Sequence, residues 1–226
     1  AQIARTELGV EKVAVLPADT RVGSAGSSSA SRQTYMTGAA VKRACEAVRE
    51  RLFERVREEF GEGLDELLLD DSKVVSEVRG VIVSLVELLG GEEIEELVEF
   101  HHKETFPLDE KGQGDAHVQF AFAAHRAVVE VDTELGLARV VEIAAAQDVG
   151  TAINPQVLEG QIEGGIAQGL GLALMEEIQV REGKVLNSSF TDYLIPTILD
   201  MPPVRAEILE LADPEAPYGL KGVGEP

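Results

Sequence analysis

The longest amphipathic pattern in the chain covers residues 34–60, where apolar side chains recur at spacings of three and four. Such spacing places them on one face of an α-helix. The members of this stripe are Val41, Cys45, Val48, Leu52 and Val56. The pattern therefore predicts a helix from about Thr34 to Phe60, and it predicts that the Cys45 thiol is buried in the core rather than reactive.

A second helical pattern, DVGTAINPQVLEGQIEGGIAQGLGLALMEE (residues 148–177), is interrupted by five glycines. Asn154 followed by Pro155 is a helix start signal, and apolar residues then recur every four positions. Each glycine costs about 1 kcal/mol relative to alanine in a helix interior, so five cost about 5 kcal/mol. Two readings explain them: close packing against another element, or a bulky group that lies against the bare backbone and is hydrogen-bonded by Gln161.

The remaining pattern is one of short strands and a few short helices. Residues 117–131 and 137–147 alternate or are β-branched, and residues 132–136 supply a turn, which predicts a β-hairpin. The other predicted elements are strands at 10–16, near 184–187 and near 204–211, a short helix at 81–89, and a segment at 93–104 that is either helix or strand. Strands and helices do not alternate strictly, so the expected fold class is α+β, with mixed sheets and packed helices.

Composition narrows the classes of partner. The chain has 226 residues, of which 44% are hydrophobic, so a folded core is expected. Its net charge of −21 argues against nucleic acid and anionic membranes as partners, and no apolar run reaches the length of a membrane span. A single cysteine rules out an intramolecular disulfide and favours the reducing cytoplasm.

Taken alone, no single residue or loop is strong evidence for a functional site. The four histidines do not have the spacing of a metal site, so we expect no metal ligation by side chains, and neither nucleotide-binding fingerprint is present. The loop RVGSAGSSSASRQ, which leads into the first long helix, is either an anion cradle or an ordinary loop. At the end of the chain, YGLKGVGEP surrounds Glu225 with glycines. Glu225 is either a solvated carboxylate or a site residue, and Lys221 is close enough in sequence to be its charge partner.

Taken together, five segments resemble one known family. They are GSSSASRQTYMTGAAV, GQGDAHVQFAFAAHRAVVEVD, QDVGTAINPQVLEGQIEGGIAQGLGLALMEE, SSFTDYLIPTILDMPPV and KGVGEP. In this order they are similar to the second half of the molybdenum-cofactor subunit of the xanthine dehydrogenase and aldehyde oxidase family, and most similar to bacterial multi-subunit xanthine dehydrogenases. The resemblance covers nearly the whole chain and is weakest at residues 55–100.

The resemblance implies oxidative hydroxylation of a purine such as xanthine or hypoxanthine, with oxygen derived from water. It implies a molybdenum–molybdopterin cofactor, or its cytosine dinucleotide form, held without protein side chains as metal ligands. Electrons would leave through 2Fe-2S clusters and FAD on partner subunits or domains. By position, Glu225 matches the catalytic base, Gln161 matches a glutamine beside the cofactor, and Ala30, Ser31 and Gln33 fall in a loop that contacts it.

The family's subunit has a long preceding half, with a further glycine–glutamine loop and substrate-binding residues, that does not match this sequence. The resemblance therefore implies that residues 1–226 are the C-terminal portion of the molybdopterin-binding domain, with an internal division allowed near 100–116, and that this chain alone is inactive. The alternatives are a hydroxylase of another N-heterocycle or an aldehyde, and a non-catalytic scaffold or interaction module in which Glu225 has no role.

Overall fold

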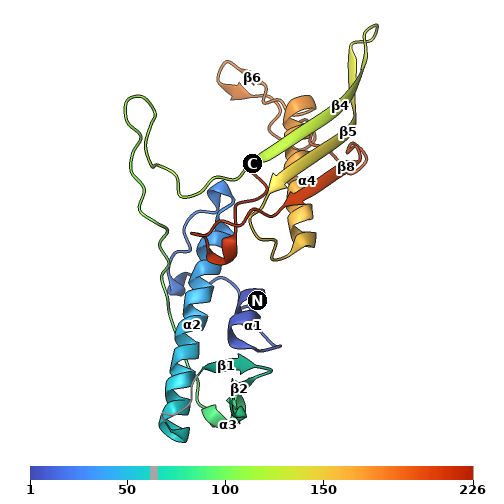
Figure 1. Ribbon diagram of the computed structural model, residues 1–226. Coiled ribbons are helices and arrows are strands. Elements are labelled where there is room, and N and C mark those ends of the chain that lie inside the picture. The colour runs from blue at the N-terminus through green and yellow to red at the C-terminus, as the bar shows by residue number, and fades with distance from the viewer. Residues whose placement is uncertain (62–65, 226) are drawn as a thin grey trace. The chain divides into compact units, whose positions relative to one another are not determined.

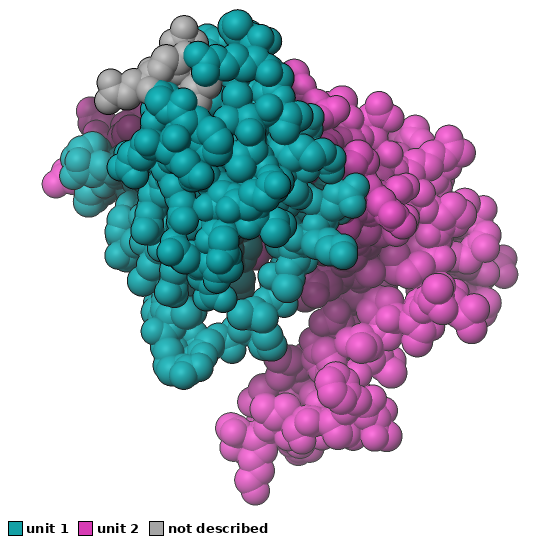
Figure 2. All heavy atoms as spheres, turned by 90° about the horizontal axis from the view of Figure 1, so that it is seen from below, with its two compact units in different colours: residues 1–28, 33–107 teal, residues 29–32, 108–226 magenta. Residues whose placement is uncertain are grey.

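The computed structural model describes residues 1–61 and 66–225, and it confirms the predicted α+β class (Figure 1). The chain forms two compact units, which Figure 2 shows in different colours. Unit 1 consists of residues 1–28 and 33–107, and unit 2 consists of residues 29–32 together with the chain from residue 108 onward. The assignment of residues 1–226 to one portion of a larger domain stays a prediction.

Unit 1 packs helices against a small sheet. Helices α1 (Gln2–Leu8), α2 (Gln33–Phe60) and α3 (Leu85–Leu89) accompany the antiparallel strands β1 (Leu67–Asp70), β2 (Lys73–Ser76) and β3 (Gly80–Ser84). The predicted long helix is confirmed as α2. Its stripe reaches the core, whose buried members are Leu52, Phe53, Val56, Leu67, Val74, Val83 and Leu88. Cys45 is buried as expected, and that burial raises the pKa of its thiol.

Three expectations for unit 1 need correction. The strand predicted at residues 10–16 is wrong, because this stretch pairs with no strand among the described residues and Leu16 is 81% exposed. The helix predicted at 81–89 begins only at Leu85: its β-branched first part pairs with β2 as β3, and the Ser84 hydroxyl then accepts the N–H of Glu87 in a capping box. Residues 93–104 are neither helix nor strand.

Strands β1 and β2 were not predicted, although their turn carries a readable signal. Asp71 and Ser72 join the two strands with left-handed backbone, at φ values of 45° and 59°. Two such residues in a row form the tight turn that matches the twist of a hairpin, and aspartate tolerates this conformation better than most residues.

Unit 2 is built on a three-stranded sheet of order β4-β5-β8. Strand β4 (Ala123–Asp132) pairs antiparallel with β5 (Leu137–Asp148), which confirms the predicted hairpin but begins it at residue 123 rather than 117. Strand β8 (Val204–Leu209) pairs parallel with β5 and confirms the predicted strand near 204–211. A separate small hairpin, β6 (Val180–Arg181) and β7 (Lys184–Val185), includes the strand predicted near 184–187.

The glycine-rich helix is α4 (Pro155–Leu174), and it packs against the sheet of unit 2 (Figure 1). Asn154 caps it as predicted, accepting the N–H of Val157 through its side chain at 3.2 Å. The core between helix and sheet contains Ile143, Ala145, Ile162, Ile166 and Leu170. The described residues also form 3₁₀ turns at Thr20–Val22 in unit 1, and at Ser29–Ser31 and Pro217–Gly219 in unit 2.

Candidate functional site

Two loops of unit 2 that are far apart in sequence lie against each other around Glu225. The hydroxyl of Ser31 accepts the backbone N–H of Glu225 at 3.1 Å. The carbonyl oxygen of Ala30 lies 3.2 Å from the point where a Cβ on Gly222 would stand. Ala30 and Ser31 have left-handed backbone, at φ 59° and 52°, a conformation that non-glycine residues keep only where surrounding contacts hold it. Three of the predicted site residues, Ala30, Ser31 and Glu225, are therefore brought together.

Helix α4 adds a fourth predicted residue to this group. The carbonyl oxygen of Gly224 approaches Gly165 so closely that a Cβ there would overlap it. Gln161, one turn earlier on the helix, places its Oε1 3.4 Å from the Cβ position of Gly224. Gly224 itself has φ +107°, a conformation that any other residue would adopt only with strain. The carboxamide of Gln161 thus lies beside the segment that carries Glu225.

The five glycines of α4 have different neighbours. Gly165 admits the backbone of Gly224, and Gly171 admits the side chains of Glu176 and Pro196. Of the two readings offered by the sequence, close packing against another element therefore holds at these two positions, because protein atoms occupy that space. At Gly160, Gly164 and Gly169, a Cβ would have no described atom within 4 Å, so the helix surface there is open.

Gln33 is the one predicted site residue that belongs to unit 1. Its Nε2 donates to the carbonyl oxygen of Ser27 at 3.3 Å, and its Oε1 accepts the hydroxyl of Thr37 at 2.7 Å. These bonds tie the side chain to the loop before α2 and to the first turn of that helix.

A buried ion pair that the sequence analysis missed supports the last segment of the chain. Lys221 Nζ lies 2.5 Å from Asp148 Oδ2, with side chains only 13% and 3% exposed. Asp148 Oδ1 also accepts the N–H groups of Gly150 at 3.0 Å and Leu211 at 3.3 Å. Burial by itself raises the pKa of Asp148, but the Lys221 ammonium and these N–H groups outweigh it and hold that pKa below its usual value.

This pair overturns the expectation that Lys221 is the charge partner of Glu225. Proximity in sequence suggested that pairing, whereas the fold brings Asp148 from the end of β5 to the lysine across 73 positions. The carboxylate of Glu225 is exposed in this chain.

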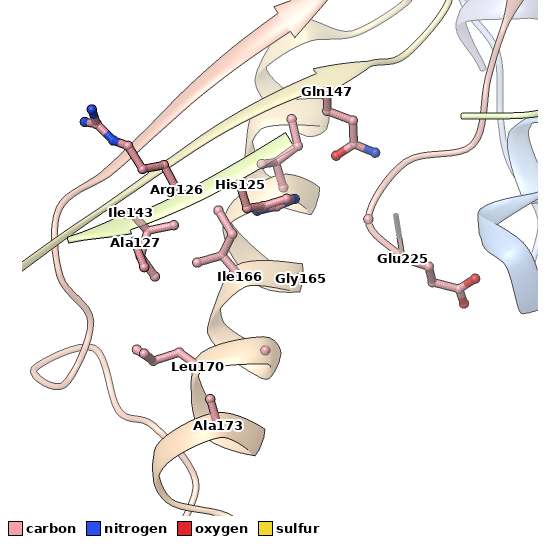
Figure 3. A pocket seen from close by; sticks show the side chains of 13 residues that line it. His125, Arg126, Ala127, Ile143, Gln147, Gly165, Ile166, Leu170, Ala173 and Glu225 are labelled. Atoms are coloured by element: carbon pink, nitrogen blue, oxygen red, sulfur yellow. The ribbon is translucent and has the colours of Figure 1, made fainter. Parts of the chain in front are cut away.

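Between α4 and the β4–β5 hairpin lies a pocket of about 520 Å³ (Figure 3). Its walls are mostly apolar side chains and glycines of α4 and the two strands, and Gly224 and Glu225 form one side. Gln147, at the end of β5, also lines it and is 1% exposed. Its Nε2 has no hydrogen-bond partner among the described residues. Gln147 was not among the predicted site residues. It lies two positions after Ala145 and four after Ile143, on the same inward face of the strand.

Neither a metal cluster nor a membrane-spanning helix is found in the described part of the chain. Across residues 1–61 and 66–225, no group of three His, Cys, Asp or Glu side chains could hold a metal ion. In the same ranges, no helix is both long enough and apolar enough to cross a bilayer. The predicted site residues instead offer carboxamide, hydroxyl and carboxylate groups, which bind an organic group by hydrogen bonds.

Comparisons with known proteins agree on one family. The model of the molybdopterin cofactor-binding domain family matches residues 1–202. The chain is 31% identical to a probable xanthine dehydrogenase subunit of Bacillus subtilis, over 99% of this chain and 30% of that protein. It is 28% identical to the nicotine 6-hydroxylase large subunit of Paenarthrobacter nicotinovorans, over 100% of this chain and 28% of that protein. The crystal structure of quinoline 2-oxidoreductase from Pseudomonas putida matches with a TM-score of 0.72 at 27% identity, over 99% of this chain and 29% of that one.

Proposed function

Because this chain belongs to the molybdopterin cofactor-binding domain family, we propose that it forms part of a molybdenum hydroxylase that oxidises a purine such as xanthine or hypoxanthine. The chain spans about 30% of the length of the relatives it matches along its whole sequence. The 31% identity with the probable xanthine dehydrogenase subunit supports the purine substrate. The likeness to the nicotine and quinoline enzymes favours the alternative, another N-heterocycle.

The residues of unit 2 fit an organic cofactor. Gly160 and Gly164 leave the surface of α4 open, and the carboxamide of Gln161 on the same stretch of helix is exposed and both donates and accepts hydrogen bonds. Ala30 and Ser31 add a constrained loop next to the Glu225 segment. We assign these residues to binding of molybdopterin or its cytosine dinucleotide form, and Gln33 of unit 1 stays a separate prediction. When bound, this group supplies a molybdenum centre that accepts two electrons from the substrate.

Glu225 is assigned the role of general base. A carboxylate oxygen of Glu225 would take the proton from the water-derived nucleophile as that nucleophile attacks the substrate. The observation that carries this assignment is the way the backbone is held: Ser31 accepts the Glu225 N–H, and Gly224 packs on Gly165. A base held by its backbone is positioned before the substrate arrives, which lowers the entropic cost of proton transfer.

The proposed enzyme is a hetero-oligomer in the cytoplasm. Relatives are named as a dehydrogenase subunit, as a large chain and as the gamma subunit of a complex, so they are parts of multi-subunit assemblies. The corresponding partners here are the remaining portion of the molybdopterin subunit, a 2Fe-2S subunit and an FAD subunit. The single cysteine of this chain is consistent with cluster ligands located on a partner.

The test is to purify the intact complex from its source and to quantify molybdenum, iron and flavin. We expect stoichiometric molybdenum, and hydroxylation of xanthine or hypoxanthine in which the new oxygen carries the label of H₂¹⁸O. A stable complex without molybdenum would instead support the scaffold or interaction module. A molybdenum-loaded complex that hydroxylates quinoline or an aldehyde but no purine would support the alternative substrates.

A further inference from the structure

Gln147 is an anomaly in the core of unit 2. It follows Ile143 and Ala145 on the face of β5 that packs against α4, and all three are at least 92% buried. An inward position of this kind is normally apolar, because a buried amide without a partner loses its hydrogen bonds to water. The Nε2 of Gln147 is such a group, with no partner among the described residues.

The surroundings of Gln147 indicate where its partner belongs. The residue lines the pocket between α4 and the β4–β5 hairpin, and Figure 3 shows its carboxamide pointing away from β5, toward the side where the Glu225 segment lies. The volume of about 520 Å³ is within the range of small-molecule sites. An unpaired donor at the wall of such a pocket is explained by an acceptor atom on whatever occupies it.

We propose that Gln147 Nε2 donates a hydrogen bond to the substrate, so that Gln147 is a specificity-determining residue of this pocket. The walls formed by Ile143, Ile162 and Ile166 suit the flat face of a ring, and Gly169 adds no side chain on the helix side. The lining also includes His125 and the charged residues Arg126 and Glu225. The chemical class is therefore a planar heterocycle or aromatic carbonyl compound, whose ring nitrogen or carbonyl oxygen accepts the bond.

This inference rests on the proposed hydroxylase function and deepens it. Glu225 borders the same pocket, so a ring held by Gln147 would face the segment that carries the proposed base. The hydrogen bond would fix which ring atom lies near Glu225, and thereby which carbon is hydroxylated. Gln147 acts in this scheme on orientation and affinity, whereas Glu225 acts on the chemical step.

The experiment compares wild type, Gln147→Leu and Gln147→His in the molybdenum-loaded complex. Leucine removes the donor and suits the apolar face, whereas histidine restores an N–H at a similar reach. The probes are hypoxanthine, quinoline and benzaldehyde. Dissociation constants are measured by equilibrium dialysis on the dithionite-reduced, anaerobic complex, which does not turn over. Turnover of the oxidised complex gives KM and kcat separately, and thermal unfolding is followed without probe.

For a probe that wild type hydroxylates, we expect Gln147→Leu to weaken binding by roughly 2- to 13-fold, the value of one neutral hydrogen bond, and to raise KM more than it lowers kcat. Gln147→His should recover most of the affinity. The midpoint temperature of the probe-free complex should stay the same or rise, because no protein partner is lost and an unpaired buried amide is removed. Unchanged probe affinity in Gln147→Leu, or a clear fall in its midpoint temperature, would overturn the inference.

Failure of the proposed function gives a different result. In that case the wild-type complex lacks molybdenum or hydroxylates none of the three probes. The thermal comparison still decides about Gln147 in that case, because destabilisation by leucine would show that the amide already has a partner within the protein.

Discussion

Glu225 is held in place by a serine 194 positions earlier in the chain. At the residue scale, this is what separates the proposed base from an ordinary carboxylate in a glycine-rich loop. The hydroxyl of Ser31 binds the backbone N–H of Glu225, so the side chain stays free for proton transfer. No local pattern around GVGEP encodes this contact. The resemblance of the motif was needed to select Glu225, and the structure supplies the physical reason why its backbone is ordered.

Replacing Glu225 with glutamine removes the base but keeps the size and the hydrogen bond from the backbone. In the molybdenum-loaded complex, we expect reduction by substrate to slow by at least about 10²-fold, with molybdenum content unchanged, since general-base catalysis typically contributes about 10²–10⁴-fold. Anaerobic stopped-flow spectroscopy isolates this half-reaction. Glu163→Gln, an exposed carboxylate on α4, is the matched control. Reduction of the Glu225→Gln complex within a few-fold of wild type would remove Glu225 from the mechanism.

At the element scale, α4 shows that one sequence feature can serve two purposes. The start signal at Asn154 and the four-residue apolar spacing predicted the helix and its buried face correctly, because both depend on local geometry. The purpose of each glycine could not be read from the sequence. Gly165 and Gly171 are required by protein atoms that arrive from residues 176, 196 and 224, whereas Gly164 faces open space.

Two neighbouring glycines therefore provide a paired test. Gly165→Ala places a methyl group onto the carbonyl oxygen of Gly224, so we expect it to destabilise the complex by about 1–3 kcal/mol and to lower turnover by displacing the Glu225 segment. Gly164→Ala meets no described atom and removes the helix penalty of glycine, so in the cofactor-free complex it should be neutral or stabilising by up to about 1 kcal/mol. Denaturant unfolding measures both. Equal effects at the two positions would contradict the contact between α4 and Gly224.

The pair Asp148–Lys221 joins the end of β5 to the segment before Glu225, and it makes a prediction about pH. Because the folded pKa of Asp148 is below its unfolded value of 3.8, its stabilising effect is present above that pH and is lost as the pH falls toward the folded pKa. Asp148→Asn leaves a largely buried ammonium unpaired and should cost about 3–5 kcal/mol at pH 7.

Urea unfolding of wild type and Asp148→Asn between pH 7 and pH 3 checks this (the range brackets the 3.8 reference value). The gap between the two unfolding free energies should narrow below about pH 4, where the unfolded wild-type aspartate becomes protonated. Adding Lys221→Met to Asp148→Asn should recover part of the loss, because no unpaired charge then remains. A gap that is constant with pH would show that the carboxylate does not act through its charge.

At the scale of the whole molecule, the sequence predicted the elements better than their connections. The long helix, the hairpin and the glycine-rich helix carry strong periodic signals, and all three are present. The failures concern tertiary pairing: residues 10–16 alternate but pair with no strand in the described part of the chain, and Asp148 pairs with Lys221 across 73 positions. Gln147 was overlooked because a single glutamine in an apolar strand acquires meaning only when its neighbours are known.

The last prediction concerns the chain by itself. It spans about 30% of the length of the relatives that it matches along its whole sequence. In unit 2, Glu225 lines the pocket and is exposed to solvent. A cofactor rich in polar groups is retained only when most of those groups are hydrogen-bonded and shielded from water. Gln161 and the loop of Ala30 and Ser31 supply a part of such a shell, and the rest is assigned to the remaining portion of the subunit.

We therefore expect the chain, produced alone in a host that makes molybdopterin, to contain far less than one molybdenum per chain and to hydroxylate no purine. Co-production with the remaining portion should restore molybdenum, measured by elemental analysis alongside circular dichroism to verify that the lone chain is folded. Stoichiometric molybdenum on a folded lone chain would show that these residues suffice, and that the rest of the subunit serves substrate binding rather than cofactor retention.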